Sequence, residues 1–239
     1  MPLAEFVGGY SSPRARGKRK EEGRPRYNGP VMQPERFASL LGEVRASAIL
    51  RCPTREAAAS AMEAAVRGGF RIVEFTLTIP GALDLVEEFS RRQDLIVGAG
   101  TVLTSDEARS AVGRGAQFLV SPVIDPDVIA TGLSCGVAFI PGCHTPTELL
   151  AAHRAGAPLQ KLFPAPGIGP AYVRACLGPL PFLRIVPTHG VDATNARAWL
   201  DAGAHAVGFT HALFDAGDIK AGRFDRIEER ARALLAAVR

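Results

Sequence analysis

The chain repeats a helix-and-strand unit at a regular interval, and this repeat limits the fold more than any other feature. Its helical stretches end at Gly69, Gly115, Gly136, Gly156 and Gly203, and glycine is the usual residue just past a helix end. The intervals between these glycines are 46, 21, 20 and 47 residues. Two intervals correspond to one unit of roughly 20 residues and two to about double that length, so the repeat contains two unmarked turns.

Short apolar runs follow the helical stretches, and they show no alternation of polar and apolar residues. Such runs are typical of parallel strands that are buried on both faces. The expected strands are 46–51, 71–77, 95–102, 117–122, 137–142, 159–164, 184–189 and 206–210. Eight strands that alternate with helices, without a second module, predict a single α/β domain folded as a (β/α)8 TIM barrel over residues 31–239. An open, doubly wound sheet is the alternative.

Composition excludes several other classes of protein. Of the 239 residues 47% are hydrophobic, enough for a full core. No apolar run approaches the roughly 18 residues of a membrane span, so we expect no membrane partner. The four cysteines are scattered without a C-x-x-C motif. This pattern favours a reduced, cytoplasmic protein over a disulfide scaffold.

The net positive charge belongs to the N-terminal segment. Residues 1–30 contain seven basic and three acidic residues, which accounts for the formal charge of +4, and the remainder carries 21 of each sign. The segment is rich in proline, glycine and charge, so we expect a disordered basic extension. We expect no nucleic-acid partner, although a nucleic-acid-binding tail and a true start at Met32 are alternatives to a solvated extension.

Two ionisable residues occupy interior positions of the expected strands. Lys161 is the only lysine, and Glu74 the only acid, within any of them. Alternate residues of a barrel strand point inward. Glu74 shares a face with Ile72 and Thr76, and Lys161 shares one with Phe163. If both faces point inward, an acid and an amine lie in one lumen.

This pair has a structural and a catalytic interpretation. A buried Glu–Lys ion pair often stabilises a protein little, because desolvation offsets the attraction. Alternatively, burial lowers the pKa of a lysine, and the neutral amine of Lys161 can then attack a ketone to form an imine. Glu74 would be the acid/base that moves protons around that imine.

The chain from Ala46 onward resembles the class I aldolases that act on 2-keto-3-deoxy-6-phosphogluconate (KDPG) and 4-hydroxy-2-oxoglutarate. The segments that carry the resemblance, in family order and spacing, are GGFRIVEFTLT, IVGAGTVLT, AQFLVSP, FIPGCHTPTE, KLFPA and PTHGV. The resemblance implies that Lys161 is the Schiff-base lysine and Glu74 the proton carrier. The residues that it implies around the substrate are Thr101, Pro122, Phe163 and Thr188.

The same resemblance implies a reaction and an assembly. The substrate would be a 2-keto-3-deoxy sugar acid, cleaved reversibly to pyruvate and an aldehyde such as glyceraldehyde 3-phosphate or glyoxylate. It implies no metal and no cofactor, and a homotrimer.

The carboxylate site departs from the family pattern. Members that act on KDPG usually have an arginine four residues after the glutamate, and this chain has Thr78 there. Arg51, at the end of the first strand, is the candidate replacement, since a guanidinium can hold a carboxylate with two parallel hydrogen bonds. The branch that acts on the galactonate-derived epimer has a similar first strand. The alternative is a surface arginine just past a strand.

The phosphate site departs as well. Family members have Gly-Gly after strand seven and glycine followed by serine after strand eight, where backbone N–H groups hold the phosphate. This chain has His189-Gly190 and Phe209-Thr210. Either the N–H groups are retained and the imidazole adds charge, or the side chains fill the site. We expect a phosphorylated sugar acid.

Two other functions are consistent with the same residues. His144, His189 and His211 follow three strands, and with Glu74 they could bind a divalent metal in a lyase or hydrolase. The second of these functions is a barrel that binds a ligand without catalysing a reaction. The combination of Lys161, Glu74 and Thr101 favours the aldolase.

Overall fold

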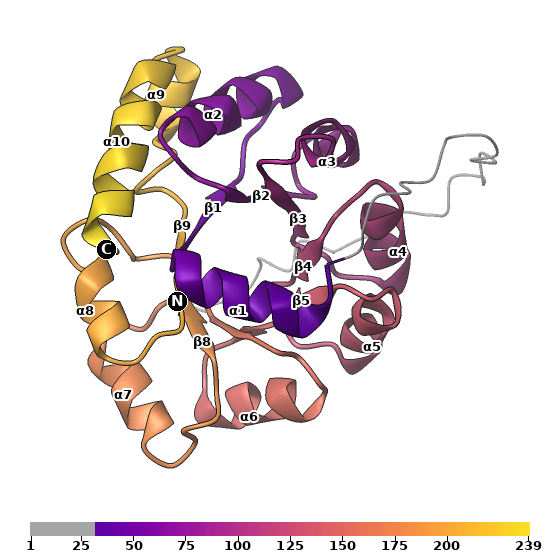
Figure 1. The fold of residues 1–239 in the computed structure, drawn as a ribbon, viewed down its shortest axis with the longest axis vertical. Coiled ribbons are helices and arrows are strands. Elements are labelled where there is room, and N and C mark those ends of the chain that lie inside the picture. Colours follow the sequence, from indigo (N-terminus) through magenta and orange to yellow (C-terminus); the bar gives the residue numbers. More distant parts are fainter. Residues whose placement is uncertain (1–31) are drawn as a thin grey trace, which may run out of the picture.

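The chain folds into a closed barrel of parallel strands surrounded by helices (Figure 1). The computed structural model describes residues 32–239, so the extension expected at residues 1–30 lies outside the described residues. The strands are β1 (Ala46–Leu50), β2 (Ile72–Thr76), β3 (Ile96–Gly100), β4 (Phe118–Val120), β5 (Ala138–Ile140), β6 (Gly142–Cys143), β7 (Gln160–Leu162), β8 (Ile185–Pro187) and β9 (Val207–Phe209).

The strands form two arcs that join into one ring. The first arc has the order β5-β4-β3-β2-β1-β9 and the second β6-β7-β8, with every pairing parallel. Only Pro141 separates β5 from β6, so these two short strands form one side of the barrel. A bridge between Thr188 and Gly208 joins β8 to β9 and closes the ring. The predicted (β/α)8 barrel is confirmed, with all eight expected strands.

The helices alternate with the strands and form the outer layer. They are α1 (Pro34–Val44), α2 (Arg55–Arg67), α3 (Ala82–Ser90), α4 (Ser105–Gly113), α5 (Pro126–Ser134), α6 (Pro146–Arg154), α7 (Ala171–Leu177), α8 (Ala196–Asp201), α9 (Ala216–Lys220) and α10 (Phe224–Ala237). Local sequence fixes several of their starts. Thr104 and Thr145 form capping boxes with Glu107 and Glu148, which satisfy N–H groups that the first turn leaves free.

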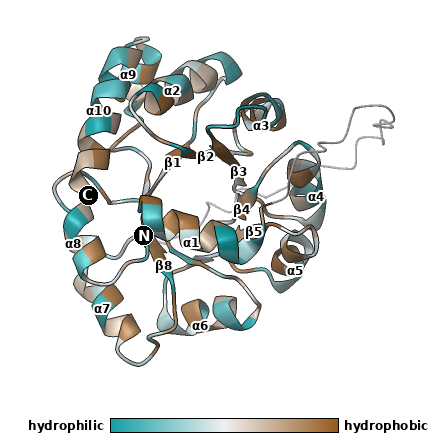
Figure 2. Ribbon diagram, in the orientation of Figure 1, coloured by the Kyte–Doolittle hydropathy of each residue, from teal (hydrophilic) through white to brown (hydrophobic). Residues whose placement is uncertain are grey.

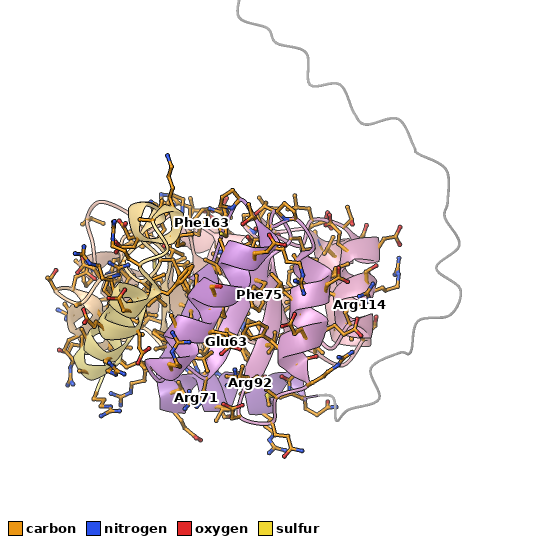
Figure 3. The ribbon with its side chains drawn as sticks, turned by 90° about the horizontal axis from the view of Figure 1, so that it is seen from above. Glu63, Arg71, Phe75, Arg92, Arg114 and Phe163 are labelled. Carbon is orange, nitrogen blue, oxygen red and sulfur yellow. The ribbon has the colours of Figure 1, made fainter. Side chains whose placement is uncertain are left out.

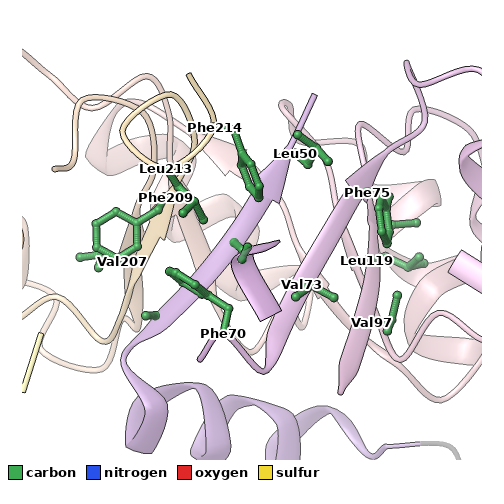
Figure 4. Close-up of a cluster of buried hydrophobic side chains, with 14 of the residues drawn as sticks. Leu50, Phe70, Val73, Phe75, Val97, Leu119, Val207, Phe209, Leu213 and Phe214 are labelled. Carbon is green, nitrogen blue, oxygen red and sulfur yellow. The ribbon is translucent and has the colours of Figure 1, made fainter. Parts of the chain in front are cut away.

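Buried apolar side chains lie in two layers. One layer separates the barrel from its helices, and Figure 4 shows part of it around Phe70, Val73 and Val207. Hydrophobic residues face the barrel and hydrophilic ones face outward (Figure 2). The second layer fills the lower lumen, where α1 crosses the amino ends of the strands. There the Phe37 ring stacks on Phe118 with 4.5 Å between centroids.

Because α1 covers the amino end, the lumen of the barrel formed by residues 32–239 opens at the carboxyl ends of the strands. Figure 3 shows the two ends, with Phe163 on one edge and Arg71 and Arg92 toward the other. Functional sites of (β/α)8 barrels lie at the carboxyl ends. No helix within residues 32–239 is long and apolar enough to cross a membrane.

Candidate active site

Lys161 occupies the middle of β7 and points into the lumen. Its backbone is level with Gly142 on one neighbouring strand and Val186 on the other. The side chain is only 7% exposed, and its Nζ lies 4.7 Å from the centre of the Phe163 ring. A lysine this deeply buried is rare unless it has a partner or a function.

Glu74 faces the same lumen from β2. The side chain is 2% exposed, and its Oε1 has no hydrogen-bond partner within the described residues. Gly100, at the end of the neighbouring β3, makes room for it, because a Cβ at Gly100 would lie 1.8 Å from Oε1. The carboxyl oxygen therefore has space and no fixed partner, as a group that exchanges protons with a ligand requires.

Burial shifts both groups toward their neutral forms. It raises the pKa of the Glu74 carboxyl, and the charges of Lys161 and Arg51 oppose this rise only in part. Burial lowers the pKa of the Lys161 amine, against the attraction of Glu74 and with the help of Arg51. A neutral amine is the nucleophilic form of lysine, so the site favours attack on a carbonyl carbon.

Both groups lie in an open pocket at the carboxyl end of the barrel, with an empty volume of about 540 Å³. Its lining residues are Ile49, Arg51, Glu74, Thr76, Thr101, Pro122, Lys161, Phe163, Thr188, His189, Thr210, His211 and Phe214. The predicted residues that the structure brings together here are Arg51, Glu74, Thr101, Pro122, Lys161, Phe163, Thr188, His189 and Thr210.

Phe209 is not in this pocket, and the expectation that its side chain lies near the phosphate site is wrong. The side chain is fully buried on the helix-facing side of β9, where its ring meets Phe70 edge-on at 6.0 Å (Figure 4). Alternation along β9 explains this, because Gly208 and Thr210 face the lumen and Phe209 faces the helices. Gly190 follows His189 at φ 81° and does not line the pocket.

Four lining residues were not predicted as substrate-binding residues: Ile49, Thr76, His211 and Phe214. Thr76 lies two residues after Glu74, so the strand alternation that placed Glu74 contained the signal for it. The sequence pattern indicated His211 only as a metal ligand. Phe214 enters from the turn before α9, where strand periodicity gives no information.

The histidines do not assemble the metal site considered as an alternative. His144 lies outside the pocket, and its Nδ1 is 3.0 Å from the carbonyl oxygen of Pro164. Within residues 32–239, no group of three or more His, Cys, Asp or Glu residues could hold a metal ion.

A barrel whose lumen presents a buried lysine with a lowered pKa and a buried carboxyl group is the arrangement of a Schiff-base, or class I, aldolase. The family model for KDPG and KHG aldolase matches residues 38–230. The chain therefore belongs to the KDPG and KHG aldolase family, whose members cleave 2-keto-3-deoxy sugar acids to pyruvate and an aldehyde.

Known proteins agree with this assignment. The chain is 32% identical to the 2-dehydro-3-deoxy-6-phosphogalactonate aldolase of Escherichia coli over 197 residues, which covers 80% of this chain and 93% of the relative. It is similar to KDPG aldolase from Legionella pneumophila captured with pyruvate as a covalent carbinolamine (TM-score 0.76, 26% identity, 85% and 98% covered). It also resembles a designed cage built by fusing symmetric oligomeric domains (TM-score 0.74, 30% identity, 81% and 71% covered).

Proposed function

We propose that this enzyme cleaves a phosphorylated 2-keto-3-deoxy sugar acid, with Lys161 as the Schiff-base lysine and Glu74 as the proton carrier. One observation supports these roles above the others. The amine and the carboxyl group share a buried lumen that favours their neutral forms, next to an open pocket. A neutral amine can add to the C2 ketone, and a neutral carboxyl can supply the proton that the departing water requires.

The cleavage step then follows from the protonated imine. Glu74, now ionised, accepts the proton of the C4 hydroxyl as the C3–C4 bond breaks. The bonding electrons pass into the imine and form the enamine of pyruvate, and the aldehyde leaves. Glu74 returns the proton to C3, and water hydrolyses the imine to release pyruvate and regenerate Lys161.

Arg51 is the proposed partner of the substrate carboxylate. It lines the pocket, and its charge acts on both Lys161 and Glu74. Within residues 32–239 it forms no ion pair, so its guanidinium is available to a ligand. Thr78 hydrogen bonds to Thr76 (Oγ1 to Oγ1, 2.8 Å) and brings no charge to the site. The similarity to a phosphogalactonate aldolase supports the same assignment.

The position of Phe209 supports a phosphorylated substrate. Its side chain faces the helices, so it leaves the carboxyl end of β9 open to a ligand. His189, Thr210 and His211 line this end of the pocket, where the resemblance places the substrate phosphate.

The test is covalent trapping followed by a substrate panel. Borohydride should reduce the imine between pyruvate and the enzyme, and mass spectrometry should locate the adduct on Lys161. Activity should survive EDTA. Lys220→Met, which removes an exposed lysine on α9, is the control and should still trap pyruvate. Loss of activity in EDTA without any adduct would contradict the proposal.

We also infer a cytoplasmic homotrimer. All four cysteines are free, which suits a reducing compartment. Leu103 and Val123 are 47% and 50% exposed on loops beside the pocket, where a neighbouring subunit could cover them. The similarity to a cage subunit described as a fusion of symmetric oligomeric domains supports an oligomer. Light scattering coupled to gel filtration should give three times the mass of the chain, and the mass of a monomer would refute this inference.

A further inference from the structure

A small chamber continues from the pocket into the lower lumen, beneath Glu74 and Lys161. Both of these side chains line the pocket and the chamber, as do Ile49 and Thr188. Ser47 is a polar lining residue that belongs to the chamber alone. The mechanism proposed above gives no role to Ser47 or to the chamber. The rest of the lining is apolar and comes from α1 and the lower strands, through Phe37, Leu41, Phe118, Val120, Ile140 and Val186.

Ser47 points into the lumen from β1. It lies two residues before Ile49 on the same face of the strand, and Ile49 is level with Glu74 on β2. The hydroxyl of Ser47 is therefore one layer below the carboxyl group. The residue is only 7% exposed, and its hydroxyl forms no hydrogen bond within residues 32–239. A buried hydroxyl without a partner is costly, so we expect it to bind a polar ligand in the chamber.

A second hydroxyl lies at the same level of the lumen, on the far side of β9. Gly208 is level with Ser47 on one neighbouring strand and is bridged to Thr188 on the other. A Cβ at Gly208 would lie 2.8 Å from Thr188 Oγ1, so any larger residue would fill the space beside that hydroxyl. Thr188 Oγ1 donates one long hydrogen bond to the carbonyl of Val186, at 3.4 Å, and its lone pairs can still accept hydrogen bonds.

The size and lining of the chamber suit one water molecule. The centre of a water molecule has about 20 Å³ in which to move there, and roughly 10–15 Å³ is enough to hold one. A buried water also needs about two to four polar partners, whereas cavities that stay dry are apolar. The chamber offers the hydroxyls of Ser47 and Thr188 and the amine of Lys161. Glu74 adds the carboxyl oxygen Oε1, which has no partner among the described residues.

A water molecule in this chamber lies beside the two groups that hydrolysis of an imine involves. The carbon C2 of the imine is bonded to Lys161 Nζ, and Lys161 lines the chamber. Glu74 lines it too, and its carboxylate is the base that can take a proton from the water. Water in the pocket above must share its space with the carboxylate and methyl group of bound pyruvate. Water held from below has no such competitor.

We propose that the chamber is a water site, in which Ser47 and Thr188 position the water molecule that hydrolyses the imine on Lys161. The water oxygen adds to C2 while the electrons of the C=N bond move to nitrogen, and the Glu74 carboxylate takes a proton from the water. Glu74 then gives a proton to Nζ and takes the hydroxyl proton of the carbinolamine. The ketone forms, the C–N bond breaks, and the amine and the carboxyl group return to their neutral forms.

Ser47 is a positioning residue in this proposal, since it acts through the water. The inference rests on the proposed function, because it requires an imine on Lys161.

The experiment counts the deuterium atoms that pyruvate gains each time it binds. In deuterium oxide, bound pyruvate exchanges its methyl protons through the enamine until hydrolysis of the imine releases it. Slower hydrolysis with unchanged proton transfer therefore yields more pyruvate with two or three deuterium atoms at low conversion, which mass spectrometry measures. Ser47→Ala should slow hydrolysis by about three- to tenfold, as expected for the loss of one hydrogen bond, and should shift the label in this direction.

Ser47→Thr and Ser47→Val form a matched pair, because their side chains have the same shape and only threonine keeps the hydroxyl. Ser47→Thr should retain the wild-type label distribution, and Ser47→Val should shift it as Ser47→Ala does. Ser90→Ala is the control outside the lumen. Ser90 is a buried serine on α3, 8% exposed, whose hydroxyl donates to the carbonyl of Glu87 at 3.0 Å. Borohydride trapping of pyruvate in each variant verifies that the barrel is folded.

Three outcomes would overturn the water site. An unchanged label distribution in Ser47→Ala and Ser47→Val would mean that the water comes from the open pocket. Equal losses in hydrolysis and in proton exchange would make Ser47 a structural part of the lumen. Equal shifts in Ser47→Thr and Ser47→Val would assign the effect to shape and not to the hydroxyl. A wild type that traps no pyruvate would refute the proposed function itself.

Discussion

At the scale of single residues, the position of the Glu74 carboxyl depends on the absence of a side chain at residue 100. A Cβ at Gly100 would lie 1.8 Å from Oε1 and 2.6 Å from the carboxyl carbon, distances that no real contact reaches. The backbone there is paired in a strand and has little freedom to move. Any larger residue must therefore displace the carboxyl group.

We predict that Gly100→Ala keeps imine formation and loses proton transfer. The variant should still trap pyruvate with borohydride, since Lys161 is untouched, but more slowly than the wild type, because a displaced Glu74 protonates the departing water poorly. It should exchange the pyruvate methyl protons with solvent deuterium about a hundred- to ten-thousandfold more slowly, as expected when a general acid/base is misplaced. Glu74→Gln should show the same separation, and NMR of pyruvate in deuterium oxide measures both.

Gly113→Ala is the matched control for this prediction. Gly113 ends α4 and a Cβ there would meet nothing within 4 Å. Its exchange rate should equal that of the wild type. Wild-type exchange in Gly100→Ala would show that the carboxyl of Glu74 has room to move, or that another group carries the proton.

Strand alternation in the sequence predicted much of the site, since it is enough to place Glu74 and Lys161 in one lumen. The same alternation, applied to β9, turns Phe209 outward and Thr210 inward. The expectation for Phe209 was wrong because it compared this residue with a family glycine and not with its own neighbours along the strand. Phe214 cannot be found in this way, because a turn positions it.

At the scale of elements, α1 acts as the floor of the barrel. Phe37 and Leu41 are almost completely buried against the lower lumen, and the carbonyl of Ala38 lies 2.8 Å from His205 Nε2. The glycine repeat predicted the strands and outer helices because each helix-and-strand unit is formed by residues that are neighbours in the sequence. It could not predict this floor, because α1 meets residues from several strands that are far apart in the sequence.

We predict that Phe37→Ala destabilises the whole barrel without altering the chemistry of the site. Loss of a buried phenylalanine typically costs about 3–5 kcal/mol of unfolding free energy. Urea unfolding followed by circular dichroism should show this loss, while pyruvate trapping at low temperature should persist. Phe182→Ala is the control, because Phe182 is 49% exposed, and it should change stability by less than about 1 kcal/mol. Equal effects of the two variants would argue against α1 as a stabilising floor.

At the scale of the whole molecule, the barrel buries Lys161 and Glu74 where their loss of hydration opposes its stability. A lumen filled with apolar side chains is the more stable alternative, and here the lower lumen is filled in that way. Above that layer lie a carboxyl and an amine that burial drives toward neutrality. The unfolded chain lets both ionise in water, so the folded state loses their hydration.

The last prediction uses stability to separate the two interpretations of the Glu–Lys pair. If the pair is neutral when folded, Lys161→Met should stabilise the protein by about 1–3 kcal/mol at pH 7, since it replaces a poorly solvated polar group with an apolar one of similar shape. If the pair is a charged salt bridge, the same change leaves a lone buried carboxylate and should destabilise by about 3–5 kcal/mol. Urea unfolding distinguishes the signs, with Lys220→Met as a control that should change little.

The stability of the folded protein depends on pH with a definite sign. The pKa of Lys161 in the folded protein is lowered from 10.5, so below pH 10.5 this lysine binds a proton more readily in the unfolded chain than in the folded one. Wild-type stability from this group therefore rises as pH rises toward 10.5, and Lys161→Met lacks that rise. The raised pKa of Glu74 makes the folded protein less stable as pH rises above 4.5, the ordinary pKa of the group. This loss is larger in Lys161→Met, because the charge of Lys161 no longer opposes the rise. The advantage of Lys161→Met should shrink as pH rises toward 10.5, and an advantage that grows as pH approaches 10.5 would contradict the lowered pKa of Lys161.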